Sequence, residues 1–310
     1  MTVIAMTREI GSLGTEVAAG LAARLGLKII HSDLVASSIA ERLAVEASAV
    51  LRYVNGTATL LERWQIGRRK LFHYAAEETL RLAQHGNVLI KGWGAATLLR
   101  DVPGVIGVRV CAPMEFRVRV VMDRLGTTDA GAVREQIERY DAARARTMRA
   151  FFNVEQEDAR FYHIVLNTER ISVEACINTV SELAKSPRFR DNSAIRLARG
   201  DKLLDAETGS TFVERHSLTA MPLGVAVSVT DRKVTLLGTT TRGSVRKRAE
   251  NIVEDVAGAS GLDGRIVSLP NRGRALCALP CRRVSVSASA AGRVAITGAA
   301  SNNVRHRHDH

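Results

Sequence analysis

Short apolar runs alternate with longer stretches of helical periodicity through the first 186 residues. The apolar runs are typical of buried strands and lie at residues 3–6, 27–31, 87–92, 105–112 and 163–168. Stretches with a helical spacing of apolar residues lie at 14–26, 34–51, 58–85, 113–125, 129–150 and 172–185. This alternation predicts an α/β domain over residues 1–186, in which a parallel sheet lies between two layers of helices. Such sheets bind ligands at the carboxyl ends of their strands.

The pattern changes after residue 186. Residues 187–222 are polar and weakly periodic, which is typical of a linker. Residues 223–270 predict a small α+β domain, with a hairpin at 225–240, an amphipathic helix at 244–258 and a strand at 262–269. Residues 271–310 are rich in Arg, Ser, Ala and Gly, and we expect a basic, largely disordered tail there.

The net charge of +12 resides mainly in the C-terminal part of the chain. Residues 1–186 carry 24 Lys and Arg against 21 Asp and Glu, whereas residues 187–310 carry 20 against 11. A basic segment favours contact with the phosphates of nucleic acid or of acidic lipid, or serves as a solubilising tail. No aromatic residues interleave with the arginines of the tail to stack on bases, so we do not expect a nucleic-acid partner.

The cysteine content and the N-terminus bear on the compartment. The four cysteines are too few and too scattered for a disulfide framework. The sequence shows no basic and apolar leader, and no run of about 18 apolar residues that could span a bilayer. We therefore expect a cytoplasmic protein with reduced thiols and no transmembrane segment.

Residues 3–26 read as a strand, a glycine turn and a helix, which is the layout of a phosphate-binding loop. Gly11 and Gly14 would form the turn, and Thr15 could offer its hydroxyl group to a metal ion. The amides that would cradle phosphate belong to Ser12, Leu13, Gly14, Thr15 and Glu16. No lysine lies inside the loop, and Arg8 is the nearest cation. Two glycines at such a junction can also serve tight packing alone.

Several motifs in a fixed order resemble the cytidylate kinase-like family over residues 1–186. They are MTREIGSLGTEVAAGLAARLGLKIIHSDLV, GNVLIKGWGAATLLRDVPGVIGVRVCAPMEFRVRVVMDRLG, EQIERYDAARARTMRAFF and FYHIVLNTERISVEACI. The resemblance implies a P-loop nucleoside monophosphate kinase fold with three αβα layers. It also implies transfer of the γ-phosphoryl group of ATP to CMP or a similar acceptor, with Mg²⁺. Catalysis of that kind rests on positioning and charge neutralisation.

The resemblance also implies roles for charged residues on two helices. Arg139 and Arg144 match lid arginines that close over the transferred group, and Asp141 would orient them. Arg117, and with it Arg119, would be further phosphate ligands. Charges at these spacings are equally explained by a solvated helix face with ion pairs three and four residues apart.

The acceptor site implied by the resemblance contains His31, Asp33, Lys91 and Trp93. Three positions depart from the family pattern. Thr15 and Trp93 stand where the family often has arginine, and His31 stands where it has aspartate. Because losing a positioned cation can cost roughly 10³-fold in rate, these departures bear directly on turnover. We expect Lys91 to replace one of the missing charges, provided that it faces the cleft.

Residues 223–269 resemble a BON domain, a module associated with phospholipid, hydrophobic ligands and protein contacts. The cluster Arg246, Lys247 and Arg248 fits contact with an acidic surface, although a solvated helix face explains it too. Two main hypotheses therefore follow from the sequence. One is an ATP-dependent nucleoside monophosphate kinase. The other is a catalytically inactive, nucleotide-binding regulatory or scaffold protein whose BON-like module binds lipid or a protein partner.

Overall fold

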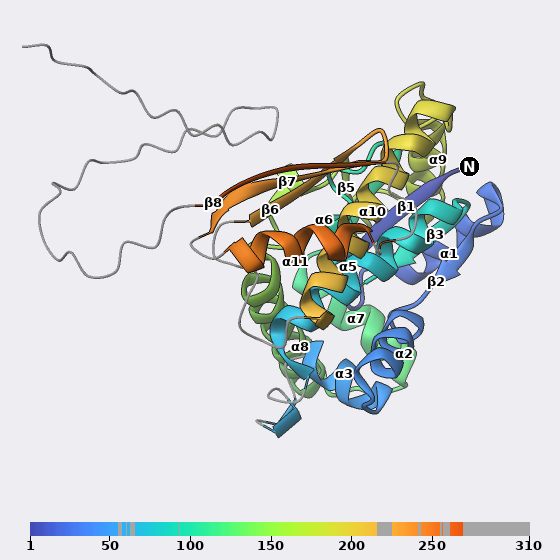
Figure 1. Cartoon of the computed structure of the whole chain (residues 1–310). Helices are drawn as coiled ribbons and strands as arrows, with labels where there is room; N and C mark the ends of the chain where they lie inside the picture. The colour runs from blue at the N-terminus through green and yellow to red at the C-terminus, as the bar shows by residue number, and fades with distance from the viewer. Residues whose placement is uncertain are drawn as a thin grey trace, which may run out of the picture. The chain divides into compact units, whose positions relative to one another are not determined.

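The computed structural model of the chain describes residues 1–54, 58–59, 61–62, 66–92, 94–215, 225–240, 243–254, 256 and 261–268 (Figure 1). Trp93, the side chains of Arg246 and Arg248, and the predicted tail at 271–310 lie outside the described residues. Predictions made for them therefore stay predictions. No helix of the described part combines the length and the apolar composition needed to cross a membrane.

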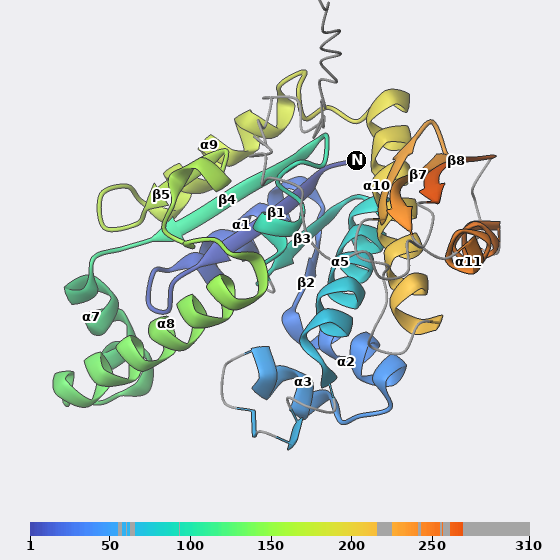
Figure 2. The ribbon, with the colours of Figure 1, turned by 60° about the vertical axis from the view of Figure 1, so that its left-hand side comes forward.

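A parallel sheet forms the centre of the N-terminal part. Within the described residues it has five strands in the order β2-β3-β1-β4-β5 (Figure 2). The strands are β1 (Val3–Arg8), β2 (Lys28–Ile30), β3 (Val88–Lys91), β4 (Val105–Cys111) and β5 (Ile164–Asn167). They confirm the predicted strands and the predicted α/β class. Residues 3–6 at the centre are fully buried, as expected for a strand covered on both faces.

Helices cover both faces of this sheet. Alternate residues of β1 point to opposite faces, so Ile4 and Met6 pack with α1 (Gly14–Leu25) and α9 (Val173–Lys185). Val3 and Ala5 face the second layer. That layer consists of α2 (Ser32–Leu43), α3 (Ala47–Val54), α5 (Arg68–His85) and α6 (Ala95–Leu98). Two further helices, α7 (Met114–Leu125) and α8 (Ala130–Phe152), pack on each other through an apolar cluster of their own.

Two predicted helices differ from the structure in their extent. The helix predicted at 34–51 is divided into α2 and α3, because Ala44 adopts a left-handed conformation with φ 53°. The helix predicted at 58–85 begins, in its long described form, at Arg68. Gly67 precedes it with φ 69°, a value that glycine adopts readily and that interrupts a helix.

A helix occupies most of the predicted linker. α10 runs from Ser193 to Arg215, and it lies alongside α5 (Figure 2). The sequence prediction of a linker at 187–222 was therefore wrong in its secondary structure. The reason is that α10 divides its apolar residues between two surfaces. Leu203 and Ala206 pack on the cluster of α5, whereas Leu204 and Phe212 pack on the C-terminal sheet.

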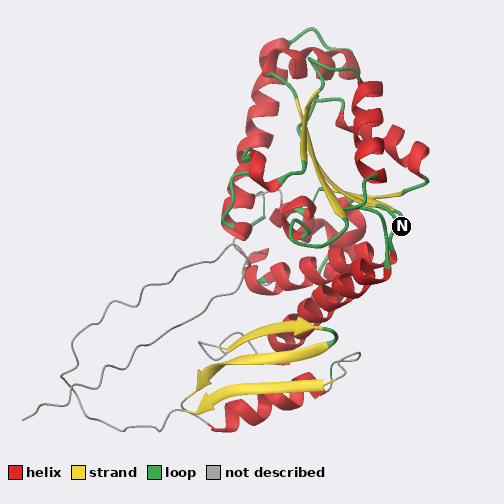
Figure 3. Ribbon diagram, turned by 90° about the horizontal axis from the view of Figure 1, so that it is seen from above, coloured by secondary structure: helices red, strands yellow, loops and turns green. Residues whose placement is uncertain are grey.

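The C-terminal part contains the predicted hairpin, helix and final strand. Within the described residues the order of its sheet is β6-β7-β8, formed by β6 (Val225–Thr230), β7 (Lys233–Thr240) and β8 (Gly261–Ser268), with α11 (Gly243–Glu254) before the last strand (Figure 3). β6 and β7 form the predicted antiparallel hairpin, and β8 adds in parallel to β7. Asp231 and Arg232 both have positive φ, as a two-residue hairpin turn requires.

An ionic network fastens α10 to α5 and α2. Glu77 on α5 is 4% exposed and accepts a hydrogen bond from Arg42 Nη1 on α2 at 2.7 Å. Arg42 also contacts Glu214 on α10, and Arg81 on α5 contacts Glu207 on α10 at 3.3 Å. Buried charges need such partners because an unpaired charge in the interior is costly. The network therefore fixes α10 against α2 and α5 of the N-terminal part.

Candidate nucleotide-binding site

The loop between β1 and α1 depends on glycine at two positions. Gly11 has φ 77°, and a Cβ atom built there would lie 2.5 Å from the backbone oxygen of Arg117. A Cβ atom at Gly14 would lie 2.7 Å from Cβ of Arg8. Both glycines thus let the loop approach its neighbours more closely than any other residue could. The predicted glycine turn is present, and close packing is part of its cause.

The first turn of α1 presents free amides. The N–H groups of residues 13–16 have no acceptor within the described residues, as expected for the start of a helix. Ser12 is different, because it is buried and points inward. Its hydroxyl donates to the Glu9 carbonyl at 2.8 Å, and its own carbonyl accepts from the Thr168 hydroxyl at 2.8 Å. An anion at the loop would therefore be held by the amides of residues 13–16 rather than by Ser12.

A buried ionic cluster supports the loop from below. The Glu9 carboxylate accepts from Arg109 Nη2 at 2.6 Å and from the Ala112 amide at 3.1 Å. Arg117 is 4% exposed, and its Nε donates to the Ile10 carbonyl at 2.7 Å. Its Nη2 donates to Asp141 at 2.8 Å. Arg117 thus carries the loop and ties it to α8, with its donors occupied by protein groups.

This arrangement changes the roles predicted for two residues. Arg117 was predicted as a phosphate ligand, but its side chain lies beneath the loop in contact with Ile10 and Asp141. Asp141 was predicted to orient Arg139 and Arg144, whereas it accepts from Arg117. Sequence spacing alone could not reveal that a buried arginine from another helix competes for this carboxylate.

Three cations lie near one another, since the charge of Arg144 acts on Arg8 and the charge of Arg8 acts on Lys91. Arg8 ends β1, Lys91 ends the neighbouring β3, and Arg144 extends from α8. None of the three forms an ion pair with a carboxylate of the described residues. Burial lowers the pKa of Arg8, and the nearby charge of Arg144 lowers it further. Burial and the charge of Arg8 likewise lower the pKa of Lys91, which Asp33 partly offsets.

These pKa shifts indicate that the three cations lie near one another and are only partly compensated, because Tyr140 and Glu16 oppose the shift of Arg8 and Asp33 opposes that of Lys91. Cations that repel one another and are partly withdrawn from water favour an anionic ligand, because the ligand relieves both penalties. Lys91 lies near Asp33, which lines a neighbouring cavity. Gly92, the next residue, lines that cavity but Lys91 itself does not, so the expectation that Lys91 faces the cleft stays a prediction.

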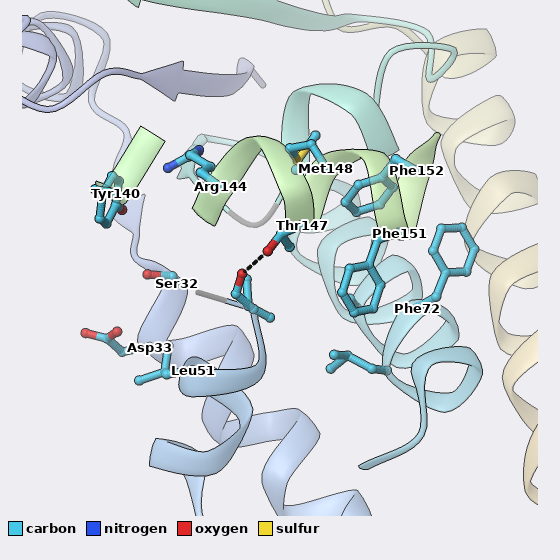
Figure 4. Close-up of a pocket in the computed structure, with 15 residues that line it drawn as sticks. Ser32, Asp33, Leu51, Phe72, Tyr140, Arg144, Thr147, Met148, Phe151 and Phe152 are labelled. Carbon is cyan, nitrogen blue, oxygen red and sulfur yellow. Dashed lines mark hydrogen bonds between the residues drawn. The ribbon is translucent and has the colours of Figure 1, made fainter. Parts of the chain in front are cut away.

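A cavity of about 210 Å³ has Arg144 in its lining (Figure 4). It lies between α8 on one side and α2, α3 and α5 on the other. Phe72, Phe151 and Phe152 line one end, while Ser32, Asp33 and Arg144 line the other (Figure 4). The hydroxyl of Thr147 in the wall is already used, because it donates to the Val54 carbonyl at 2.6 Å. The cavity thus offers an aromatic end for a flat ring and a polar end that includes Arg144.

The remaining predicted residues lie at the edge of the site or in solvent. Arg139 is exposed and pairs with Glu135, as in the alternative of a solvated helix face. Glu16 accepts from Arg124 at 2.8 Å, so its carboxylate already has a cationic partner. Thr15 is exposed at the start of α1. His31 is exposed and does not line the cavity. Arg119 is also exposed, and its Nη2 lies 3.9 Å from the Glu169 carboxylate.

The metal prediction rests on Thr15 alone. Within the described residues, no three His, Cys, Asp or Glu side chains cluster so as to hold a metal ion. Mg²⁺ is commonly held through substrate phosphates together with one or two protein ligands. An exposed Thr15 hydroxyl at the first turn of α1 fits that limited role.

Sequence reasoning missed the lining of the cavity by α8. Tyr140, Thr147, Met148 and the Phe151–Phe152 pair all line it. The pair of phenylalanines at the end of a charged helix was a usable signal, since large aromatic side chains seldom end a solvated helix without a packing partner.

Sequence comparison with known proteins identifies the family. Residues 3–170 match the model of the cytidylate kinase-like family. The chain is 27% identical over 177 residues to a cytidylate kinase of Pyrobaculum aerophilum, covering 57% of this chain and 89% of that one. It is 28% identical over 187 residues to a cytidylate kinase of Ignicoccus hospitalis, covering 59% and 99%.

A solved structure of an uncharacterized protein from Eubacterium ventriosum is similar over 60% of this chain and 99% of its own, with a TM-score of 0.47 and 17% identity. The family match alone spans more than half of the 310 residues, from the first strand to the end of the sheet. Within this span lie the loop, the three cations and the cavity. The chain belongs to the cytidylate kinase-like family.

Proposed function

We propose that this protein transfers the γ-phosphoryl group of ATP·Mg²⁺ to a nucleoside monophosphate. The observation that carries the proposal is the mutual proximity of Arg8, Lys91 and Arg144, none of which is ion-paired with a carboxylate of the described residues, with Arg144 in the cavity lining. Family membership supports the reaction class. The lack of a lysine inside the loop does not leave the site without charge, because β1 and β3 each end in a cation there.

The reaction requires positioning and charge neutralisation rather than covalent chemistry. An oxygen of the acceptor phosphate attacks the γ-phosphorus, a new P–O bond forms, and the bond to the β-phosphate oxygen breaks, leaving its electron pair on ADP. In our proposal the amides of residues 13–16 hold the donor phosphates, and Arg8, Lys91 and Arg144 offset the charge shared by donor and acceptor. Thr15 would hold the Mg²⁺ that accompanies ATP, and the ion would supply charge neutralisation for the donor phosphates.

The cavity is the proposed acceptor site. A planar base would lie among Phe72, Phe151 and Phe152, and its phosphate would lie toward the cations. Asp33 lies at the polar end beside Arg144, away from a base held among the phenylalanines, so it does not select among bases. CMP is the first acceptor to test, because the relatives reported above are cytidylate kinases.

The test uses the full chain, ATP·Mg²⁺ and CMP, dCMP, UMP, AMP and GMP in turn, with ADP formation as the readout. Arg144→Gln should lower kcat/KM by about 10²-fold or more, because a positioned donor on developing charge is worth that much. Arg139→Gln is the matched control on the same helix, and it should behave like the unmodified protein, since Arg139 is 71% exposed. Absence of turnover with every acceptor would refute the proposal.

A second candidate is a nucleotide-binding scaffold without turnover, coupled to a BON-like C-terminal module. The order α10-β6-β7-α11-β8 and the exposed Lys247 support a separate binding role for this module. Calorimetric binding of ATP·Mg²⁺ without ADP formation would favour this candidate. Co-sedimentation with phosphatidylglycerol vesicles, but not with phosphatidylcholine vesicles, would identify anionic phospholipid as a ligand of the module.

A further inference from the structure

Arg144 differs from other arginines of its helix in the partner that orients it. Three arginines of α8 pair with glutamates, namely Arg134 with Glu115, Arg139 with Glu135 and Arg149 with Glu155. Arg144 instead donates its Nε to the side-chain oxygen of Gln156 at 2.8 Å. The oxygen of a glutamine is a neutral acceptor, so it can fix a guanidinium group without cancelling its charge.

Gln156 is itself held firmly. It is 6% exposed, and its backbone oxygen accepts from Arg109 Nη1 at 2.6 Å and from the Tyr162 hydroxyl at 2.9 Å. Arg109 also donates to Glu9 at 2.6 Å, at the base of the phosphate-binding loop. A continuous set of hydrogen bonds therefore connects the loop through Arg109 and Gln156 to Arg144.

The orientation leaves the rest of the guanidinium group available. Nε of Arg144 is occupied by Gln156, while no hydrogen bond within the described residues uses its Nη1 or Nη2. Arg144 lines the cavity, and its charge reaches Arg8, whose pKa it helps to lower. A full positive charge with two free nitrogen atoms thus stands at the junction of the proposed donor and acceptor phosphates.

We propose that Gln156 is a positioning residue for phosphoryl transfer, which orients Arg144 through a neutral oxygen and so preserves the whole charge for the phosphates. The inference rests on the proposed function of the site. A carboxylate in the same place would make the same hydrogen bond but would neutralise Arg144, as the glutamates do for its neighbours. An apolar side chain would leave the charge intact and remove the orientation.

Two substitutions separate these two contributions. Gln156→Glu keeps the acceptor and adds a negative charge, so both ATP·Mg²⁺ affinity and kcat should fall, kcat by about 10²-fold. Gln156→Met has a similar volume but no acceptor, so kcat should fall about 10- to 100-fold from misorientation while ATP·Mg²⁺ affinity changes less than threefold. Gln136→Glu, on the exposed face of α8, controls for the added charge and should change neither quantity.

A double-substitution cycle distinguishes positioning from a general structural role. When Arg144 is replaced by lysine, the Nε donor is lost, so a further Gln156→Met change should lower kcat by less than threefold. A structural role would instead lower kcat to the same extent with either residue at 144. Thermal melting of each variant identifies loss of folding, and Gln156→Met remains interpretable if Gln156→Glu fails to fold.

The inference and the proposed function fail in different ways. Turnover by the unmodified protein, together with normal kcat and ATP·Mg²⁺ affinity in both Gln156 variants, would overturn the positioning role alone. No turnover with any nucleoside monophosphate would refute the proposed function. In that case calorimetry of ATP·Mg²⁺ still decides the role of Gln156, because unchanged affinity in Gln156→Glu, or no binding at all, would overturn it.

Discussion

Gly11→Ala should lower the free energy of unfolding more than a substitution that only places an alanine in a left-handed conformation. Gly26 provides the matched comparison, because it has φ 64° and a Cβ atom there would meet nothing within 4 Å. Gly11 has φ 77°, and its Cβ atom would lie 2.5 Å from the Arg117 carbonyl oxygen. That oxygen belongs to the backbone of α7, so it cannot rotate away as the end of a side chain would.

The expected magnitudes follow from these two environments. A left-handed conformation costs a non-glycine residue about 1–2 kcal/mol, which should be the whole effect of Gly26→Ala. Gly11→Ala adds an overpacking cost of about 1–3 kcal/mol, for a total of about 2–5 kcal/mol. It should also weaken ATP·Mg²⁺ binding, since any relaxation moves the loop away from Arg117 and its support.

Urea unfolding of the full chain at pH 7.5, followed by circular dichroism, gives the comparison through the midpoints of the two variants. Calorimetry of ATP·Mg²⁺ on the folded fraction gives the second readout. If Gly11→Ala unfolds at the same urea concentration as Gly26→Ala, the loop does not rest against Arg117. The argument for tight seating of the loop on α7 would then be refuted.

Two further predictions concern stability as a function of pH. Burial raises the pKa of Tyr74 to about 12 from an ordinary value near 10, with Glu214 adding to the rise. The folded state then holds this proton more tightly, so about 2–3 kcal/mol of stability should be lost between about pH 10 and pH 12. In Tyr74→Phe the free energy of unfolding should fall less steeply with pH over this range, and an unchanged slope would contradict the prediction. Burial also raises the pKa of Asp205, so its ionised carboxylate disfavours the folded state at pH 7. Asp205→Asn should therefore unfold at a higher urea concentration than the unmodified protein at pH 7, and at the same concentration at acidic pH. A lower urea midpoint at pH 7 would count against this prediction.

The sheet could be predicted from sequence because its signals are local. Each strand is a short apolar run, and glycines such as Gly26 and Gly126 end the helices that follow strands, with φ 64° at both. α10 could not be predicted in the same way. Its apolar residues serve two surfaces, so they form no single stripe with a helical period.

The candidate site shows where sequence reasoning ends. Arg8, Lys91 and the glycines of the loop could be proposed from position, since strand ends and turns are fixed by the fold. Arg117 could not be distinguished from a phosphate ligand, because only the structure reveals its bonds to Ile10 and Asp141. Gln156 carries no signal at all: a single glutamine gains its role only from what surrounds it.

The ionic network that joins α10 to α2 and α5 limits where this protein can be truncated. The family match ends at residue 170, yet Arg42 and Arg81 find carboxylates at Glu214 and Glu207. A shortened protein ending at residue 186 would keep those cations, lose their partners, and expose the side of α5 that α10 covers. The family match is therefore shorter than the part of the described chain that these contacts hold together. A fusion that replaces the C-terminal module would therefore have to keep α10 and its acidic residues with the helices they contact.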